Sequence, residues 1–153
     1  MKVCIGGTFN VLHKGHKLLI DTAFQTAGTN GFVFIGLSIG NLLENKKDTK
    51  KYNKRKRNLE NYLTKKEYMK HVVIKPISDK YGLTLEEDFD AIIVSTETKK
   101  TADEINIKRK GKGMKILKVI TIPYILAEDS LPISSSRIKK GEIDENGKIL
   151  KRE

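Results

Sequence analysis

The sequence has a single cysteine and no long apolar run. Cys4 has no second cysteine to pair with, and no Cys or His at metal-ligand spacing accompanies it. Neither a secreted disulfide scaffold nor a zinc site is therefore indicated. No segment approaches the about 20 apolar residues that a membrane-spanning helix needs. We expect a cytoplasmic protein with no membrane partner.

Aromatic residues are also few, at 7% of the chain, and no internal repeat or Pro/Ser-rich linker divides it. A length of 153 residues suits a single ordinary domain. We expect that domain to cover residues 1–143 and to be followed by a polar C-terminal tail over residues 144–153. Hydrophobic residues at 38% and charged residues at 32% fit a folded protein with a heavily charged surface.

A formal net charge of +11 fits three kinds of polyanionic partner: nucleic acid, an anionic membrane surface, or a small molecule that bears phosphates. The Lys-rich stretches at 46–57 and 108–118 are the basis for a nucleic-acid-binding alternative. Against it, no motif of alternating aromatic and basic residues is present for stacking on bases. We therefore expect no nucleic-acid partner.

Short apolar runs alternate with stretches of helical periodicity. This alternation predicts an α/β fold with one doubly wound parallel sheet of about five strands, and a ligand site where the first strand ends. The β-branched runs alternate little between apolar and polar residues, which indicates burial on both faces of the sheet. The expected strands cover 2–5, 32–37, 72–77, 91–94 and 116–122, and the expected helices cover 13–27, 52–69 and 101–110.

A motif for phosphate binding follows the first predicted strand. Glycines in Gly6-Gly7-Thr8-Phe9 allow the backbone to approach a ligand closely and to turn N–H groups toward phosphate oxygens. His13 and His16 then lie three residues apart at the start of a helix, so both face the positive end of its dipole. An anion is favoured there.

A second motif lies late in the chain, at Pro132-Ile133-Ser134-Ser135-Ser136-Arg137-Ile138-Lys139-Lys140. Its hydroxyls can cap a helix N-terminus, and cations follow one turn later. Such a terminus binds phosphate well. Taken alone, this pattern is also that of an ordinary serine-capped surface helix.

Together the two motifs resemble the nucleotidyltransferase superfamily with an HxGH signature after its first strand and an ISSxxxR/K-like signature late in the chain. Over nearly the whole length the sequence is similar to the archaeal and eukaryotic type of phosphopantetheine adenylyltransferase. Val94-Ser95-Thr96-Glu97-Thr98, Ile105-Asn106 and Arg109 resemble that type's middle segment. Three positions depart from the usual pattern, with Asn10, Val11 and Ser136 where Asp, Pro and Thr are frequent.

The resemblance implies transfer of the adenylyl group of ATP to 4′-phosphopantetheine, with Mg²⁺ carried by ATP and no protein ligands assigned to a metal. The same motifs would also serve another acceptor, such as FMN, NMN, or glycerol 3-phosphate with CTP. His16 and Lys139 are the implied catalytic residues, and Thr8, Lys46 and Lys47 the implied acceptor-binding residues. The implied ATP-binding residues are Gly7, Thr8, Phe9, His13, Gly15, His16, Glu97, Arg109, Ile133, Ser134, Ser135 and Ser136. The sequence carries no signal for the oligomeric state.

Overall fold

Five strands form one parallel sheet in the order β3-β2-β1-β4-β5, in a computed structural model that describes residues 1–44 and 49–150. The strand order reverses between β1 and β4, as in a doubly wound fold. The predicted fold class is therefore confirmed. The strands are β1 (Lys2–Gly7), β2 (Phe32–Ser38), β3 (Val72–Ile77), β4 (Ala91–Ser95) and β5 (Lys118–Ile122).

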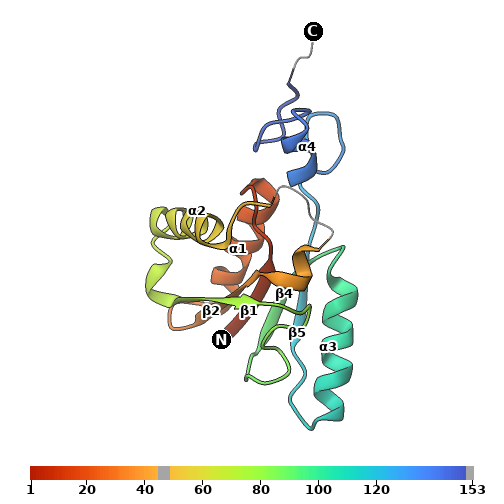
Figure 1. Cartoon of the computed structure of the whole chain (residues 1–153). Helices are drawn as coiled ribbons and strands as arrows, with labels where there is room; N and C mark the ends of the chain where they lie inside the picture. Colours follow the sequence, from red (N-terminus) through yellow and green to blue (C-terminus); the bar gives the residue numbers. More distant parts are fainter. Residues whose placement is uncertain (45–48, 151–153) are drawn as a thin grey trace.

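Helices cover both faces of this sheet. Figure 1 shows α1 and α2 on one face and α3 on the other. The helices are α1 (Lys14–Ala27), α2 (Tyr52–Lys65), α3 (Lys99–Gly111) and the short α4 (Ser135–Lys139), with 3-10 turns η1 (Gly40–Leu43) and η2 (Met69–His71).

Two apolar clusters hold the layers together, as the unalternating strands predict. On the face of α1 and α2, Val3 and Ile5 of β1 pack in one cluster with Ile20 and Leu59. On the opposite face, Cys4 belongs to a second cluster that α3 covers. Successive residues of a strand point to opposite faces, so β1 is buried on both sides and its carboxyl end emerges at the centre of the fold.

The helix boundaries follow from local backbone chemistry. Gly28 caps α1 with a positive φ of 80°, and its N–H donates to the carbonyl of Phe24 at 3.1 Å, as expected. The second helix was predicted to run to Met69, and this is wrong. It ends at Lys65 because the chain turns at Glu67, whose φ is 62°, and Met69 is 41% exposed.

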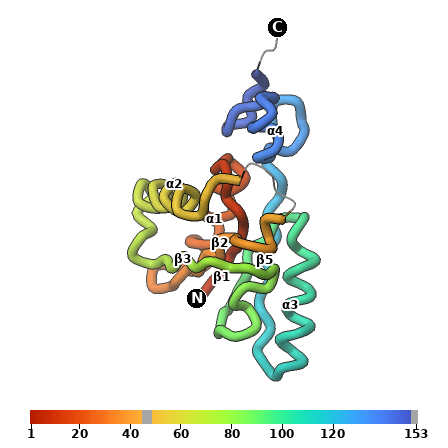
Figure 2. Tube along the Cα trace, viewed as in Figure 1, coloured from red at the N-terminus to blue at the C-terminus, as the bar shows by residue number. Residues whose placement is uncertain are grey.

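Residues 123–150 form a small C-terminal lobe beyond the carboxyl ends of the strands (Figure 2). Its core consists of Ala127, Ile133 and Ile143. Residues 144–150, predicted as a polar tail, are hydrogen-bonded to this lobe and to α1: Gly147 accepts from the N–H of Glu128 at 3.0 Å, and Glu145 accepts from the N–H of Lys14 at 3.3 Å. Among the described residues, no helix has the length and apolar character to cross a membrane.

Candidate active site

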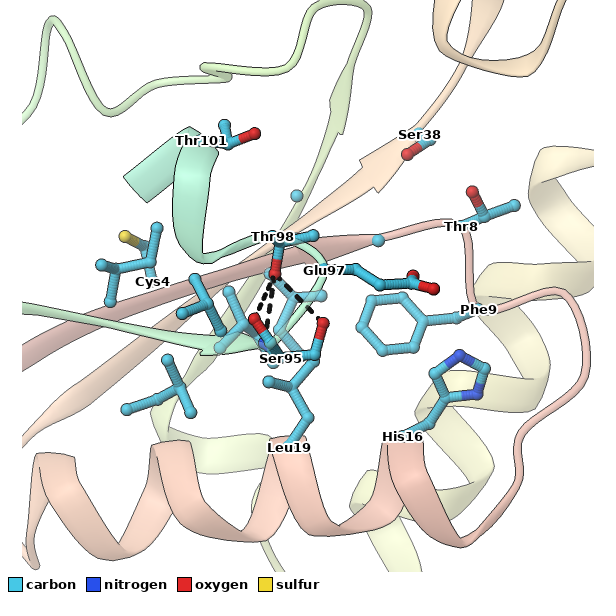
Figure 3. Close-up of a pocket in the computed structure, with 18 of the residues that line it drawn as sticks. Cys4, Thr8, Phe9, His16, Leu19, Ser38, Ser95, Glu97, Thr98 and Thr101 are labelled. Atoms are coloured by element: carbon cyan, nitrogen blue, oxygen red, sulfur yellow. Dashed lines mark hydrogen bonds between the residues drawn. The ribbon is translucent and has the colours of Figure 1, made fainter. Parts of the chain in front are cut away.

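A pocket of 520 Å³ opens at the carboxyl ends of β1 and β4, where the strand order reverses. This is the position that the sequence predicts. The end of β1 and the loop that follows line it with Gly7, Thr8 and Phe9, and the end of β4 and the turn that follows line it with Ser95 and Glu97. Figure 3 shows Thr8, Phe9, His16 and Glu97 gathered at one end of this pocket.

The two histidines of the first motif start α1. His13 is the N-cap residue, and its Nδ1 accepts from the N–H of Gly15 at 3.0 Å. The N–H of His13 donates in return to Nδ1 of His16, at 3.4 Å. This reciprocal pair is a capping box built from imidazoles, and it satisfies two backbone donors that a helix start otherwise leaves unpaired.

The same arrangement determines what the imidazoles can do. The two rings stack with centroids 3.8 Å apart. Because each Nδ1 accepts a hydrogen bond, the neutral form of each ring carries its proton on Nε2 and can donate from there. Burial lowers the pKa of His13 to about 4, so this imidazole is neutral near pH 7. The motif therefore supplies N–H donors at the N-terminus of a helix, where an anion is favoured.

The loop that carries Thr8 has a strained backbone, and contacts from the start of α2 hold it in place. Phe9 has a φ of 47°, which is uncommon for a residue with a side chain, and it is only 1% exposed. Arg55, at the start of α2, donates from Nη1 to the carbonyl of Thr8 at 3.0 Å and from Nε to that of Lys50 at 2.8 Å. Asn10 accepts from the N–H of Lys50 at 2.8 Å. These contacts fix the conformation of the loop.

The second motif reaches the same pocket from the C-terminal lobe. Ser134 caps α4, where its hydroxyl accepts from the N–H of Arg137 at 3.2 Å. Ser135 donates from its hydroxyl to the carbonyl of Val11 at 3.5 Å, and both serines line the pocket. Segments 124 positions apart in sequence are thus joined beside the start of α1.

The turn after β4 is ordered by its own hydroxyls. Thr98 accepts at Oγ1 from the N–H of Ser95 at 3.1 Å, and the two hydroxyls lie 3.3 Å apart. Glu97, between them, extends its carboxylate toward the ring of Phe9 (Figure 3). It is the one carboxylate among the described residues that line the pocket.

Comparisons with known proteins agree with this geometry. A family model described as cytidylyltransferase-like matches residues 4–141. The phosphopantetheine adenylyltransferase of Methanosarcina mazei is 44% identical over 151 residues, which cover 98% of this chain and 97% of the relative. That of Methanosarcina acetivorans is 45% identical over 153 residues, which cover 99% and 97%. This chain belongs to the phosphopantetheine adenylyltransferase family. A solved structure from Archaeoglobus fulgidus, described as a protein with unknown function, is similar with a TM-score of 0.72 and 34% identity, covering 80% of this chain and 89% of that one.

Three residues that the family resemblance placed in the site do not line the pocket. Arg109 is fully buried, and its guanidinium group donates to the backbone carbonyls of three residues outside the nucleotide loops. Nε and Nη1 are used in these bonds, whereas Nη2 has no hydrogen-bond partner among the described residues. These contacts within the protein do not support the predicted contact with ATP. Ser136 and Lys139 are exposed on α4 and do not line the pocket. Lys46 and Lys47 lie outside the described residues.

Other residues shape the pocket without having been predicted from the family motifs. Arg55 does not line the pocket itself but donates to the backbone carbonyls of Thr8 and Lys50, and so holds the loop that does. Tyr81 and Leu83 line the pocket from the connection between β3 and β4. No motif marks that connection. The one available signal is its placement directly after a parallel strand, where loops line ligand sites.

Among residues 1–44 and 49–150, no group of three or more His, Cys, Asp or Glu side chains is placed to hold a metal ion. The pocket offers Glu97 together with the hydroxyls of Thr8, Ser134 and Ser135. This donor set fits Mg²⁺ that arrives already bound to substrate phosphates, since Mg²⁺ commonly uses few protein ligands in such sites.

Proposed function

We propose that this protein transfers the adenylyl group of ATP to 4′-phosphopantetheine, yielding dephospho-coenzyme A and pyrophosphate. Membership of the phosphopantetheine adenylyltransferase family supports the reaction. The observation that carries the proposal is the meeting of His13 and His16 with Ser134 and Ser135 around one pocket. The predicted cytoplasmic location stays a prediction.

The reaction is a direct displacement at phosphorus. A phosphate oxygen of the acceptor attacks the α-phosphorus of ATP and forms the new pyrophosphate linkage, while the bond from the α-phosphorus to the bridging oxygen of the β-phosphate breaks. Pyrophosphate leaves with that oxygen and its electron pair. No protein nucleophile is needed, because the attacking group is already an anion and catalysis consists of positioning and charge stabilisation.

The first motif supplies the donors for this step. His16 donates from Nε2 to the α-phosphate as negative charge builds in the transition state. His13 donates to the triphosphate as a neutral imidazole, in keeping with its lowered pKa. Thr8 orients the acceptor phosphate through its hydroxyl. Gly7, Phe9 and Gly15 shape the surrounding backbone.

The leaving pyrophosphate is assigned to the second motif. The backbone N–H groups and hydroxyls of Ser134, Ser135 and Ser136 would hold the β- and γ-phosphates, with Ile133 packed behind them. Lys139 would neutralise charge on pyrophosphate from α4. Glu97 is assigned to the nucleotide, Lys46 and Lys47 to the acceptor phosphate. Mg²⁺ would be carried in by ATP and would supply further charge neutralisation at the phosphates.

The rest of the pocket supports an acceptor with an extended body. Beyond the phosphate motifs it continues over the sheet, where Phe34, Gly36, Tyr81 and Leu83 line it. A cavity of 520 Å³ is large enough for a small organic ligand rather than phosphate alone. Such an apolar extension matches a phosphorylated acceptor that has a long, weakly polar chain.

The direct test is to incubate the purified protein with ATP, Mg²⁺ and one acceptor at a time, following pyrophosphate release. The acceptors are 4′-phosphopantetheine, FMN and NMN, with CTP and glycerol 3-phosphate as a further pair. We expect release only with 4′-phosphopantetheine, and dephospho-coenzyme A as the product. Release with FMN alone would overturn the assignment of the acceptor, and the absence of release with every pair would overturn the reaction.

A further inference from the structure

One side of the pocket is formed by a segment without helix or strand. Residues 78–88, which we call the wall segment, connect β3 to β4 through successive turns, such as the bond from the N–H of Thr84 to the carbonyl of Tyr81 at 3.0 Å. Members of this segment from Lys80 to Thr84 line the pocket. Because no ladder or helix fixes the wall segment, its position depends on contacts with the rest of the protein.

Arg109 makes the most buried of these contacts. Its side chain comes from the last turns of α3 and is 0% exposed. Nη1 donates to the carbonyl of Thr84 at 2.5 Å and to that of Glu87 at 3.0 Å, while Nε donates to the carbonyl of Lys115 at 2.7 Å. One guanidinium group therefore joins the wall segment to α3 and to the chain that leads into β5.

A second, more exposed contact holds the pocket end of the wall segment. The hydroxyl of Tyr81 donates to Glu104 of α3 at 3.1 Å, and Lys80 pairs with the same carboxylate at 2.9 Å. Lys108 lies over the ring of Tyr81, 5.2 Å from its centroid. Partly exposed contacts of this kind contribute less than buried ones.

The wall segment and β2 lie close together at the pocket. The side chain of Ile77 lies between the two: a Cβ built on Gly36 of β2 would come within 2.9 Å of it, and one built on Gly82 of the wall segment within 3.2 Å. The proposed function assigns the apolar extension of the pocket, which Tyr81 and Leu83 of the wall segment line, to the body of the acceptor. The wall segment therefore borders the proposed acceptor site.

We propose that Arg109 is a positioning residue for the acceptor: through the carbonyls of Thr84 and Glu87 it holds the wall segment in the conformation that receives the body of the acceptor. The inference rests on the proposed function. Lysine could not replace this arginine, because a single ammonium cannot span carbonyls on separate segments as the planar fork does. Without the fork, the wall segment would have to be ordered each time the acceptor binds, which weakens binding.

The test compares steady-state kinetics of the wild-type protein with those of Arg109→Lys and Tyr81→Phe, using ATP and 4′-phosphopantetheine. Arg109→Lys should raise the KM for 4′-phosphopantetheine about tenfold or more. The KM for ATP and the kcat at saturating acceptor should stay within about twofold, because the serine and histidine motifs are untouched. Tyr81→Phe removes the bond to Glu104 without removing a buried charge, and should raise the acceptor KM about threefold. Lys110→Ala, at an exposed position of α3, is the matched control and should change neither KM.

The possible outcomes separate this inference from the proposed function. A wild-type protein inactive with 4′-phosphopantetheine contradicts the function itself. If the wild type is active and both variants keep the wild-type KM for 4′-phosphopantetheine, the positioning role is contradicted. The role is also contradicted if Arg109→Lys raises the KM for ATP as much as the KM for the acceptor, or if it lowers kcat alone. If Arg109→Lys does not fold, Tyr81→Phe decides: an unchanged acceptor KM there overturns the proposal.

Discussion

Nη1 of Arg55 lies 3.0 Å from the backbone carbonyl of Thr8, and this partly buried bond joins the start of α2 to the loop that carries the phosphate motif. The arginine is 1% exposed, and it binds the chain next to Phe9, whose φ of 47° is strained. A strained residue at a functional site persists only when its surroundings hold it. Arg55 thus acts on the reaction through the backbone of Thr8.

Replacing Arg55 should therefore impair turnover. Arg55→Lys loses the guanidinium group that donates to the carbonyls of both Thr8 and Lys50. The resulting displacement of the loop should lower kcat about ten- to a hundredfold. The measurement is pyrophosphate release at saturating ATP and acceptor, with folding checked by circular dichroism. Arg57→Lys, exposed on the same helix, should retain wild-type turnover. A folded Arg55→Lys protein with unchanged kcat would refute this role.

His16 is expected to act mainly in the transition state. His16→Ala removes the Nε2 donor and should lower kcat roughly a hundred- to a thousandfold, the range found when one donor to a developing oxyanion is lost. The affinity for ATP, measured by calorimetry, should change far less. The exposed His71 provides the control, since His71→Ala should leave both quantities unchanged. Turnover that survives in a folded His16→Ala protein would be incompatible with the assignment.

The glycine of the first motif is required by the imidazole beside it. A Cβ at Gly15 would lie 2.9 Å from Cε1 and 3.1 Å from Nδ1 of His13. Gly15→Ala should displace that ring, break its bond to the N–H at position 15, and weaken ATP binding about tenfold. Gly111→Ala is the matched control, because a Cβ there meets no atom within 4 Å. It should leave ATP binding unchanged, so equal affinities for the two variants would argue against the steric explanation.

Stability should depend on pH through His13. Burial lowers the pKa of this imidazole to about 4, from an ordinary value of 6.5. Between these values the unfolded chain takes up a proton that the folded protein excludes. The contribution of neutral His13 to the free energy of unfolding is therefore fully present above pH 6.5. It is lost as the pH drops toward 4, which lowers the free energy of unfolding by up to about 3 kcal/mol.

Urea denaturation between pH 7 and pH 4.5 would measure this effect. His13→Asn keeps a side chain that caps helices well but does not titrate, so its stability should vary less over this interval. His71→Gln is the control, and its free energy of unfolding should change with pH as steeply as that of the wild type. Equal slopes for wild type and His13→Asn would show that the imidazole of His13 does not cause the loss.

The sequence predicts those features that local chemistry determines. Central strands buried on both faces, the glycine cap at Gly28 and the paired histidines at the start of α1 all follow from residue types at short spacing, and the structure contains each of them. The position of the pocket follows from the parallel topology, because loops at the carboxyl ends of parallel strands meet at the strand-order reversal.

Arg109 illustrates what could not be predicted. Its partners Thr84 and Glu87 are more than 20 positions away, and they accept through backbone carbonyls that every residue type possesses. No side-chain pattern therefore distinguishes a buried structural arginine from one that binds a phosphate. The end of α2 was misplaced for a related reason: helical spacing continues to Met69, whereas the chain stops being helical at a left-handed turn at Glu67.

The capping box of α1 uses the same imidazoles that are assigned to ATP. Helix initiation and ligand recognition consequently depend on the same two rings, the cap through Nδ1 and the ligand through Nε2. A nucleotide bound to the Nε2 side of these rings would restrict their rotation and so hold the cap closed, and the first turn of α1 would fray less often. A bound ligand would then slow amide hydrogen exchange at Lys17, whose N–H donates to the carbonyl of His13 at 3.0 Å.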